Sequence, residues 1–172
     1  MADIQEPKCY LPKFRTNDYM TLFKTHWRWL AAAWIAFVFI QSLFFKFSGS
    51  FETKHIFDTL GTFFGLPWFA STGAYIIGAF ELVASCLLFS RFWAWGAVLS
   101  FEIMCGAIVF HLFTPLGIVM PNFDSTGNIT GYDGGALFIM ACLTCFCALT
   151  LIIKDWVSEI SQIRAIIRRF DR

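Results

Sequence analysis

The chain has 172 residues, of which 58% are hydrophobic, 19% aromatic and only 15% charged, with a formal net charge of +1. That composition excludes an ordinary water-soluble domain and is typical of a membrane protein with several spans. The near-neutral charge gives no indication of a nucleic-acid partner.

Four apolar stretches are each long enough to cross the roughly 30 Å hydrocarbon core of a bilayer, which takes about 20 helical residues. They cover residues 29–45, 70–90, 93–114 and 134–153. We therefore predict one domain, an all-α polytopic membrane four-helix bundle over residues 29–153. Residues 1–28 are expected to form a tail, and residues 154–172 an amphipathic helix at the membrane interface.

Lysine and arginine are distributed unevenly along the chain. Five precede the first span, Arg91 lies between the second and third, and only Lys46 and Lys54 lie between the first and second. Five more follow the fourth span: Lys154, Arg164, Arg168, Arg169 and Arg172. The positive-inside rule then places both termini on the cytoplasmic or matrix side. A bacterial inner membrane and a mitochondrial inner membrane fit equally well.

The first span follows a polar tail and is followed by no small-residue cleavage site, so we expect it to be retained. After the fourth span, apolar residues recur at helical spacing opposite three arginines, as in a helix on a membrane surface or against a partner. The alternative left open is a solvated helix that only carries positive charge. The apolar residues are Trp156, Ile160, Ile163, Ile167 and Phe170.

Five of the six cysteines fall within predicted spans, and Cys9 precedes the first span. No structural disulfide is therefore expected in the two loops that join spans 1 to 2 and 3 to 4. Cys142 and Cys145 share a helix face, but thiols buried in hydrocarbon are poor nucleophiles. We expect these two to be small apolar side chains rather than a redox pair. No His and Cys cluster has zinc-ligand spacing, so no metal site is predicted.

Ionisable residues inside spans are costly and tend to face the interior of a bundle. Glu81 lies near the middle of the second span, on a helix face with small residues such as Gly78. Small residues let neighbouring helices approach closely. We therefore expect Glu81 to point inward and to be either protonated or paired with Lys46 or His111.

Three further polar residues lie at span ends on one level: Lys46 ends the first span, His111 ends the third and Asp133 opens the fourth. Each has a structural interpretation, as a snorkelling lysine, a histidine bonded to a carbonyl and a helix N-cap. Together with an inward Glu81 they form a candidate intramembrane polar site. If that site holds a quinone-like headgroup, Lys46 and His111 should donate the hydrogen bonds.

At these residues the chain resembles the DoxX-like (DoxX/MauE-type) four-helix membrane proteins, over about residues 36–153. The family pattern has FK-F-G ending span 1, a Glu in span 2, a His ending span 3 and D-G-G opening span 4. It is carried here by KFSGSFETKHIFDTLGTFFGLPWF, GAFELVASCLLFSRFWAWGAVLSFEIMCGAIVFHLFTPLGIV and YDGGALFIMACL, with Lys46, Gly49, Glu81, His111, Asp133, Gly134 and Gly135 at the matching positions. The resemblance implies a compact bundle in an energy-transducing membrane, tied to quinone and sulfur redox systems or their maturation. It implies no particular reaction.

Glu102 departs from the family pattern, which has a small or apolar residue at that position. It lies about 180° around its helix from His111, on a face with large apolar side chains. A carboxylate near mid-membrane that faces lipid costs about 2.5–3.5 kcal/mol. We therefore predict a partner interface at Trp95, Glu102, Gly106 and Val109. The alternative is a protonated Glu102 bonded to its own helix.

Two function classes remain. The first is a non-catalytic accessory subunit of a respiratory or other redox membrane complex, without a cofactor and with the bilayer and other membrane subunits as partners. The second is a quinone-binding protein or a thiol- or sulfur-related membrane oxidoreductase that uses the polar site. A small proton or ion transporter is disfavoured because four spans show no inverted repeat. We prefer the accessory subunit.

Overall fold

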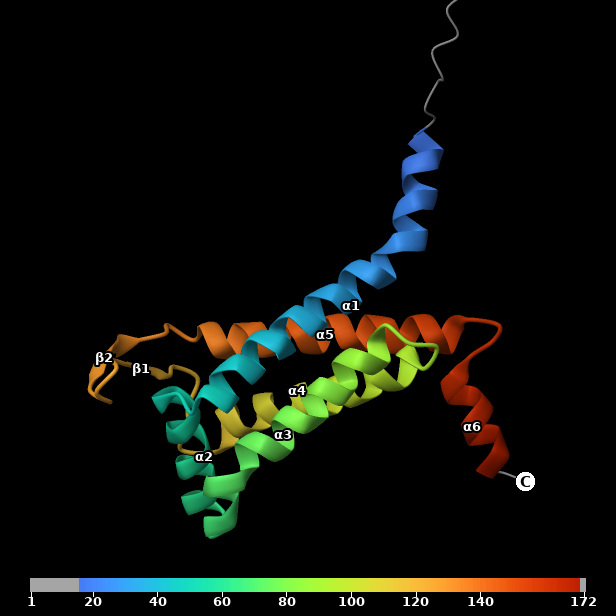
Figure 1. The fold of residues 1–172 in the computed structure, drawn as a ribbon. Helices are drawn as coiled ribbons and strands as arrows, with labels where there is room; N and C mark the ends of the chain where they lie inside the picture. Colours follow the sequence, from blue (N-terminus) through green and yellow to red (C-terminus); the bar gives the residue numbers. More distant parts are fainter. Residues whose placement is uncertain (1–15, 171–172) are drawn as a thin grey trace, which may run out of the picture.

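The computed structural model describes residues 16–170 of the chain, which are mostly helical. Figure 1 shows long helices packed side by side, with shorter elements at the two ends of the bundle. In chain order the elements are α1 (Thr16–Ser48), α2 (Phe51–Phe63), α3 (Pro67–Leu88), α4 (Trp93–Phe113), β1 (Pro121–Phe123), β2 (Ile129–Tyr132), α5 (Ala136–Val157) and α6 (Gln162–Phe170).

Four of these helices are long and apolar enough to cross a membrane: α3, α4, α5 and the His26–Ser48 part of α1. They confirm the four predicted spans, with ends that differ by a few residues. Only 22% to 39% of the most apolar window of each span is buried inside the chain. The remaining surface carries large apolar side chains such as Phe44 and Phe146. Such a surface is stable only in an apolar surrounding, so the chain is a membrane-embedded bundle.

The core of the bundle lies where α4 packs against α3 and α5, and where α1 packs against α3 and α5. Small residues set how closely the helices approach. A Cβ atom on Gly96 would lie 2.7 Å from the backbone nitrogen of Leu88, so no other residue fits there without shifting α3 and α4 apart. The fully buried core side chains include Ile35, Phe39, Ala84, Leu88, Ala97, Ala148 and Leu151.

The spanning part of α1 begins at the end of the bundle where α5 finishes, and we call this the terminal end (residues 26–30, 89–93 and 154–164). The opposite end, which we call the loop end, consists of residues 46–66 and 114–135. Which side of a membrane each end faces stays a prediction.

The loop end contains two elements that the sequence analysis treated as loop. Helix α2 crosses the end of the bundle, and the Ser50 side chain caps its start by accepting from the Thr53 backbone nitrogen at 3.2 Å. Phe57 and Leu60 bury the inner face of α2 against α3. Strands β1 and β2 pair antiparallel, with Pro121 opposite Tyr132. The all-α prediction missed this hairpin.

The predicted amphipathic helix is shorter than residues 154–172. Residues 154–157 continue α5, and α6 begins only at Gln162, at an angle to the bundle. The spacing of Trp156, Ile160 and Ile163 predicts a single helix through all three. In the structure Trp156 belongs to α5, Ile163 belongs to α6, and Ile160 lies between the two helices. The last two residues of the predicted segment, 171–172, lie outside the described residues, as do residues 1–15 of the predicted tail.

Candidate functional site

A buried ion pair joins α1 to α3. Glu81 is 2% exposed, and the Lys46 ammonium reaches both of its carboxylate oxygens, at 2.7 Å to Oε1 and 2.8 Å to Oε2. Ser42, one turn before Lys46, accepts from the same ammonium and donates to Glu81 Oε1 at 3.4 Å. The predicted inward orientation of Glu81 is confirmed, and the cation that pairs with it is Lys46 rather than His111.

The surroundings of this pair explain why it persists in an apolar span. The side chains of Lys46 and Glu81 are only 12% and 3% exposed, so each charge has lost most of its hydration. Two short charge-assisted bonds offset that loss, because a carboxylate that accepts from an ammonium at both oxygens is well satisfied. Gly78, one turn from Glu81, permits the approach of α1, since a Cβ atom there would lie 3.1 Å from Leu43 Cδ2. Of the two alternatives that the sequence left open, the structure shows the one in which Glu81 is paired with Lys46.

His111 lies in the last turn of α4, next to the loop end, and is buried, with 7% of its surface exposed. Its Nδ1 is 2.6 Å from the Gly117 carbonyl oxygen, and because a carbonyl only accepts, Nδ1 carries the proton. The ring also packs edge-on against Phe138 of α5. His111 therefore holds the chain that follows α4 down over the bundle, where Leu116 and Met120 are buried.

Asp133 fixes the other side of the same loop. Its Oδ1 accepts from the backbone nitrogens of Met120 at 2.7 Å and Gly135 at 2.9 Å, and its Oδ2 accepts from that of Leu137 at 3.1 Å. Gly134 and Gly135 have φ angles of 62° and 85°, a left-handed conformation that L side chains adopt only with strain. The D-G-G motif is thus explained by a turn that brings three backbone donors to one carboxylate.

Two carboxyl groups at the loop end have pKa values below the ordinary range of aspartate. Burial acts to raise the pKa of Asp133, but the three backbone donors and nearby His111 outweigh it and hold that pKa below 3.8. In the hairpin turn, hydrogen bonds from the Thr126 hydroxyl and from the backbone of Asn128 and Thr126 lower the pKa of Asp124 to about 2. Both groups are ionised at neutral pH, and neither is suited to act as a proton donor.

The four candidate residues thus form two groups in the structure. Lys46 and Glu81 connect α1 to α3, while His111 and Asp133 hold the loop of residues 114–120. No hydrogen bond or ion pair joins the two groups within residues 16–170. Two shallow hollows lie elsewhere, beside α2. One is lined by Asp58, Thr59, Thr62, Phe63 and Pro115, and the other by Gly61, Thr62, Gly65, Pro67 and Ala70. In the described part of the chain, no three His, Cys, Asp or Glu side chains are placed to hold a metal ion.

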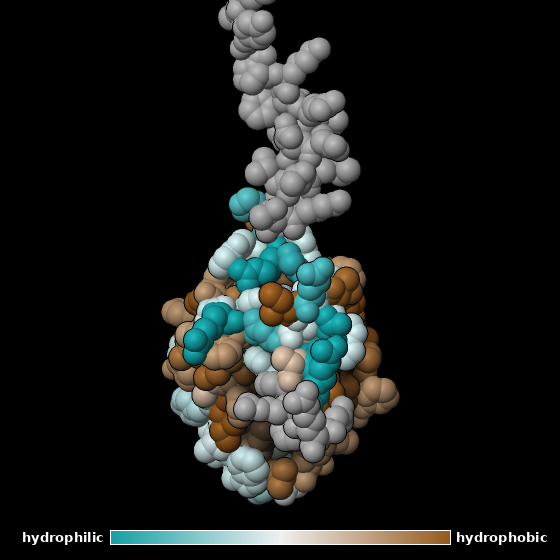
Figure 2. Space-filling model, turned by 90° about the vertical axis from the view of Figure 1, so that its right-hand side faces the viewer, coloured by the Kyte–Doolittle hydropathy of each residue, from teal (hydrophilic) through white to brown (hydrophobic). Residues whose placement is uncertain are grey.

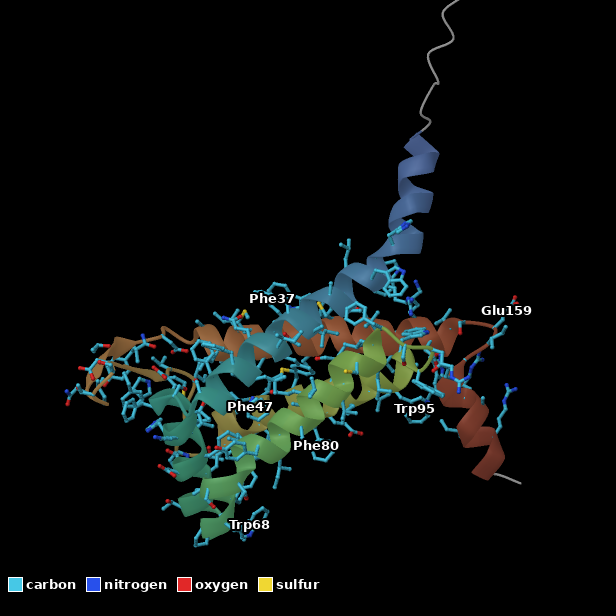
Figure 3. The ribbon with its side chains drawn as sticks, viewed as in Figure 1. Phe37, Phe47, Trp68, Phe80, Trp95 and Glu159 are labelled. Carbon is cyan, nitrogen blue, oxygen red and sulfur yellow. The ribbon has the colours of Figure 1, made fainter. Side chains whose placement is uncertain are left out.

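The predicted interface residues lie on α4. Glu102 is exposed near the middle of this 21-residue helix, and no hydrogen bond or ion pair involves its side chain in the part of the chain that the structure describes. Val109 is 47% exposed, and nothing lies within 4 Å of the Cβ position of Gly106. Trp95 is half-buried, on the outer side of α4 in Figure 3. The outward orientation predicted for Glu102 is confirmed.

The cysteines differ from the sequence expectation. On an uninterrupted helix, Cys142 would lie about 180° around the axis from Asp133. An Asp133 that faces the bundle therefore predicts that the face of Cys142 and Cys145 points outward. Instead, Cys145 Sγ lies 3.7 Å from Cys105 Sγ of α4, and both side chains are half-buried between the two helices. The angular estimate failed because α5 begins at Ala136, so Asp133 lies in the preceding turn and does not report the rotation of the helix.

Sequence reasoning missed Asp155, which is 1% exposed in the last turn of α5. Its carboxylate accepts from the Ser161 hydroxyl at 2.7 Å and from the backbone nitrogens of Gln162 and Ile163, both at 3.1 Å. These are the first donors of α6, so Asp155 caps that helix and fixes it to the bundle. The chain turn that allows this contact is not visible in any short motif, since Asp155 precedes the helix by seven residues.

Comparisons of the chain with protein-family models, with curated proteins and with solved structures find no match. The DoxX-like resemblance therefore rests on the quoted motifs alone and stays a prediction.

Proposed function

We propose that this chain is a non-catalytic membrane subunit of a larger membrane assembly, and that the assembly is a redox complex, as the DoxX-like motifs imply. The observation that carries the proposal is Glu102, an exposed carboxylate in the middle of an apolar span. Against lipid it costs about 2.5–3.5 kcal/mol even on the most lenient scale. A hydrogen-bond donor or cation from a second chain removes that cost.

The surface around Glu102 suits such a contact. Gly106, one turn away, leaves open space in which a foreign helix can approach the backbone of α4. Trp95 and Val109 provide apolar area on either side along the helix. A polar group surrounded by apolar contacts is the usual arrangement at the centre of a specific interface, because exclusion of water and lipid strengthens the polar contact.

The polar groups inside the chain also favour a structural role. The Lys46–Glu81 pair is internally satisfied, and the His111 and Asp133 groups bond to backbone atoms of one loop. A catalytic site usually has polar groups that converge on a pocket. Here they converge on each other or on the chain.

The experiment compares wild type with Glu102→Leu in native membranes solubilised in mild detergent. The proposal expects wild type to migrate in a complex larger than the chain and Glu102→Leu to lose it, as judged by native electrophoresis. Val83→Leu, a substitution at an exposed apolar position on α3, is the matched control and should leave assembly unchanged. Wild type that migrates only as a monomer, or Glu102→Leu that assembles normally, would contradict the proposal.

A thiol-based membrane oxidoreductase is the second candidate, and the Cys105–Cys145 contact of 3.7 Å favours it. In that case the two thiols form a disulfide and pass two electrons and two protons to an acceptor such as a quinone. The discriminating measurement is the redox state of the two cysteines in native membranes, determined by alkylation and peptide mass. A disulfide that forms and is reduced reversibly there would favour the enzyme, and two permanently free thiols would exclude it.

A further inference from the structure

The terminal end of the bundle carries two cations that lie against tryptophan rings. Arg28, in α1, has its Cζ 4.0 Å from the centroid of the Trp29 ring and 5.1 Å from that of Trp93. Lys154, in the last turn of α5, has its Nζ 4.7 Å from the centroid of Trp27. The two cations lie within electrostatic reach of one another, and both are half-buried.

Among residues 26–165 these cations have no carboxylate partner. The ion pair found there joins Lys46 to Glu81, far from the terminal end. Asp155 follows Lys154 in sequence, but its oxygens accept from Ser161 and the start of α6. Glu159 is exposed and lies beyond the bundle, in the loop between α5 and α6 (Figure 3). Two like charges held close together are unfavourable when none of the described side chains supplies an anion, so a bound anion would stabilise them.

More positive charge surrounds the pair at the same end. Arg91 lies in the turn between α3 and α4, and its carbonyl accepts from the Gln162 side chain at 2.8 Å, which fixes α6 beside that turn. Helix α6 adds Arg164, which donates to the Ser158 carbonyl, and the exposed Arg168. Figure 2 views the molecule from this end and shows hydrophilic side chains gathered on it, bordered by hydrophobic surface.

We propose that Arg28 and Lys154 bind the phosphate headgroup of an anionic phospholipid in the adjoining leaflet, with Trp27, Trp29 and Trp93 at the boundary between headgroup and hydrocarbon. Arginine binds phosphate oxygens in a fork, and lysine adds a point charge. Tryptophan is the residue that concentrates at this boundary. Basic pockets between transmembrane helices are a known type of lipid headgroup site.

The surface beside the cations decides between a lipid and a free phosphate ion. Leu30 is 63% exposed and Ile153 is 53% exposed, and they lie on α1 and α5, the helices that carry the two cations. Acyl chains attached to a bound headgroup would cover this apolar surface, and an inorganic ion would leave it open. The inference concerns the terminal end and does not depend on the interface at Glu102.

The test uses the full chain purified in mild detergent and native mass spectrometry with equal amounts of phosphatidylglycerol and phosphatidylcholine. Wild type should retain phosphatidylglycerol preferentially. In Arg28→Gln/Lys154→Gln the preference should fall roughly 30-fold, if each cation contributes as other membrane-proximal lysines and arginines do. The charge-conserving variant Arg28→Lys/Lys154→Arg should keep most of it.

Lys54→Gln is the matched control, because Lys54 also lies over an aromatic ring, 5.2 Å from the centroid of Phe51, but at the loop end. Its phosphatidylglycerol preference should equal that of wild type. Millimolar inorganic phosphate should not displace the bound lipid. Three outcomes would each overturn the proposal: equal retention of both lipids by wild type, an unchanged preference in the double glutamine variant, and displacement of the lipid by phosphate. The first of these is measured on wild type and does not depend on the folding of a variant.

Discussion

Glu81 and Glu102 are glutamates in apolar spans, and the fold treats them in opposite ways. Glu81 is 2% exposed and its two oxygens accept from Lys46, whereas Glu102 is exposed on α4 without a bonding partner in residues 16–170. The difference follows from the helix faces. Gly78 allows α1 to approach Glu81, whereas none of the residues that the structure describes occupies the space at Gly106, near Glu102. Close packing determines which charge the chain can neutralise by itself.

The largest effect is expected when the internal pair is broken. Glu81→Leu leaves the Lys46 ammonium with only Ser42 as a partner in a site that is largely closed to water. Removal of one member of a buried pair costs about 3–5 kcal/mol, so the free energy of unfolding should fall by that amount. Reversible unfolding of the purified chain in mixed detergent micelles measures it.

Lys46→Met/Glu81→Leu is the control for this experiment. Removal of both charges leaves no unpaired ion, and apolar replacements of similar size are often neutral or stabilising. The double variant should therefore recover most of the lost stability. If Glu81→Leu alone loses less than about 1 kcal/mol, Lys46 finds water in its absence and the pair contributes little.

Sequence reasoning recovered the parts of this molecule that depend on one helix at a time. Span positions and the orientations of Glu81 and Glu102 follow from hydropathy and from the residues on each helix face, and the structure confirms them. The choice of Lys46 as the partner of Glu81 could not be predicted, because it depends on how far α1 extends along α3.

Contacts between distant segments were the parts that the sequence did not reveal. The approach of Cys105 to Cys145 depends on the relative rotation of α4 and α5, which single-helix periodicity does not fix. Helix α2 is a short amphipathic helix within residues 46–69, which the sequence analysis treated as a loop between the first two spans. It packs against α3, the next span. Its signal was the Ser50 cap before the apolar residues Phe57 and Leu60, which a search for membrane spans does not detect.

Asp133 provides an intermediate case, a carboxylate satisfied by backbone donors outside the spans. Asp133→Ala should cost about 1–3 kcal/mol, because it leaves the donors of Met120, Gly135 and Leu137 without their acceptor. The pKa of Asp133 lies below 3.8 in the folded chain, so its contribution is present above that pH and is lost as pH falls through the lower, folded value.

Thermal unfolding in detergent at pH 5 and at pH 3 measures this contribution. Other acidic groups, such as Asp124 with its pKa of about 2, also titrate at low pH. Asp133→Asn is therefore the reference, since it keeps an oxygen acceptor and cannot titrate at this position. Wild type should lose more stability than Asp133→Asn between the two pH values, and equal losses would show that the Asp133 carboxylate has no special stability in the fold.

The smallest effect is expected at Glu102 in the isolated chain. Glu102→Leu removes no contact that the described residues make, so the free energy of unfolding in micelles should change by less than about 0.5 kcal/mol. The same substitution at Glu81 should cost several times more, although both replace a glutamate in a span by leucine. The contrast therefore separates a charge used within the chain from one available to another molecule. A loss above about 1 kcal/mol for Glu102→Leu would mean that Glu102 has a partner inside its own chain, and the interface would then have to be built without it.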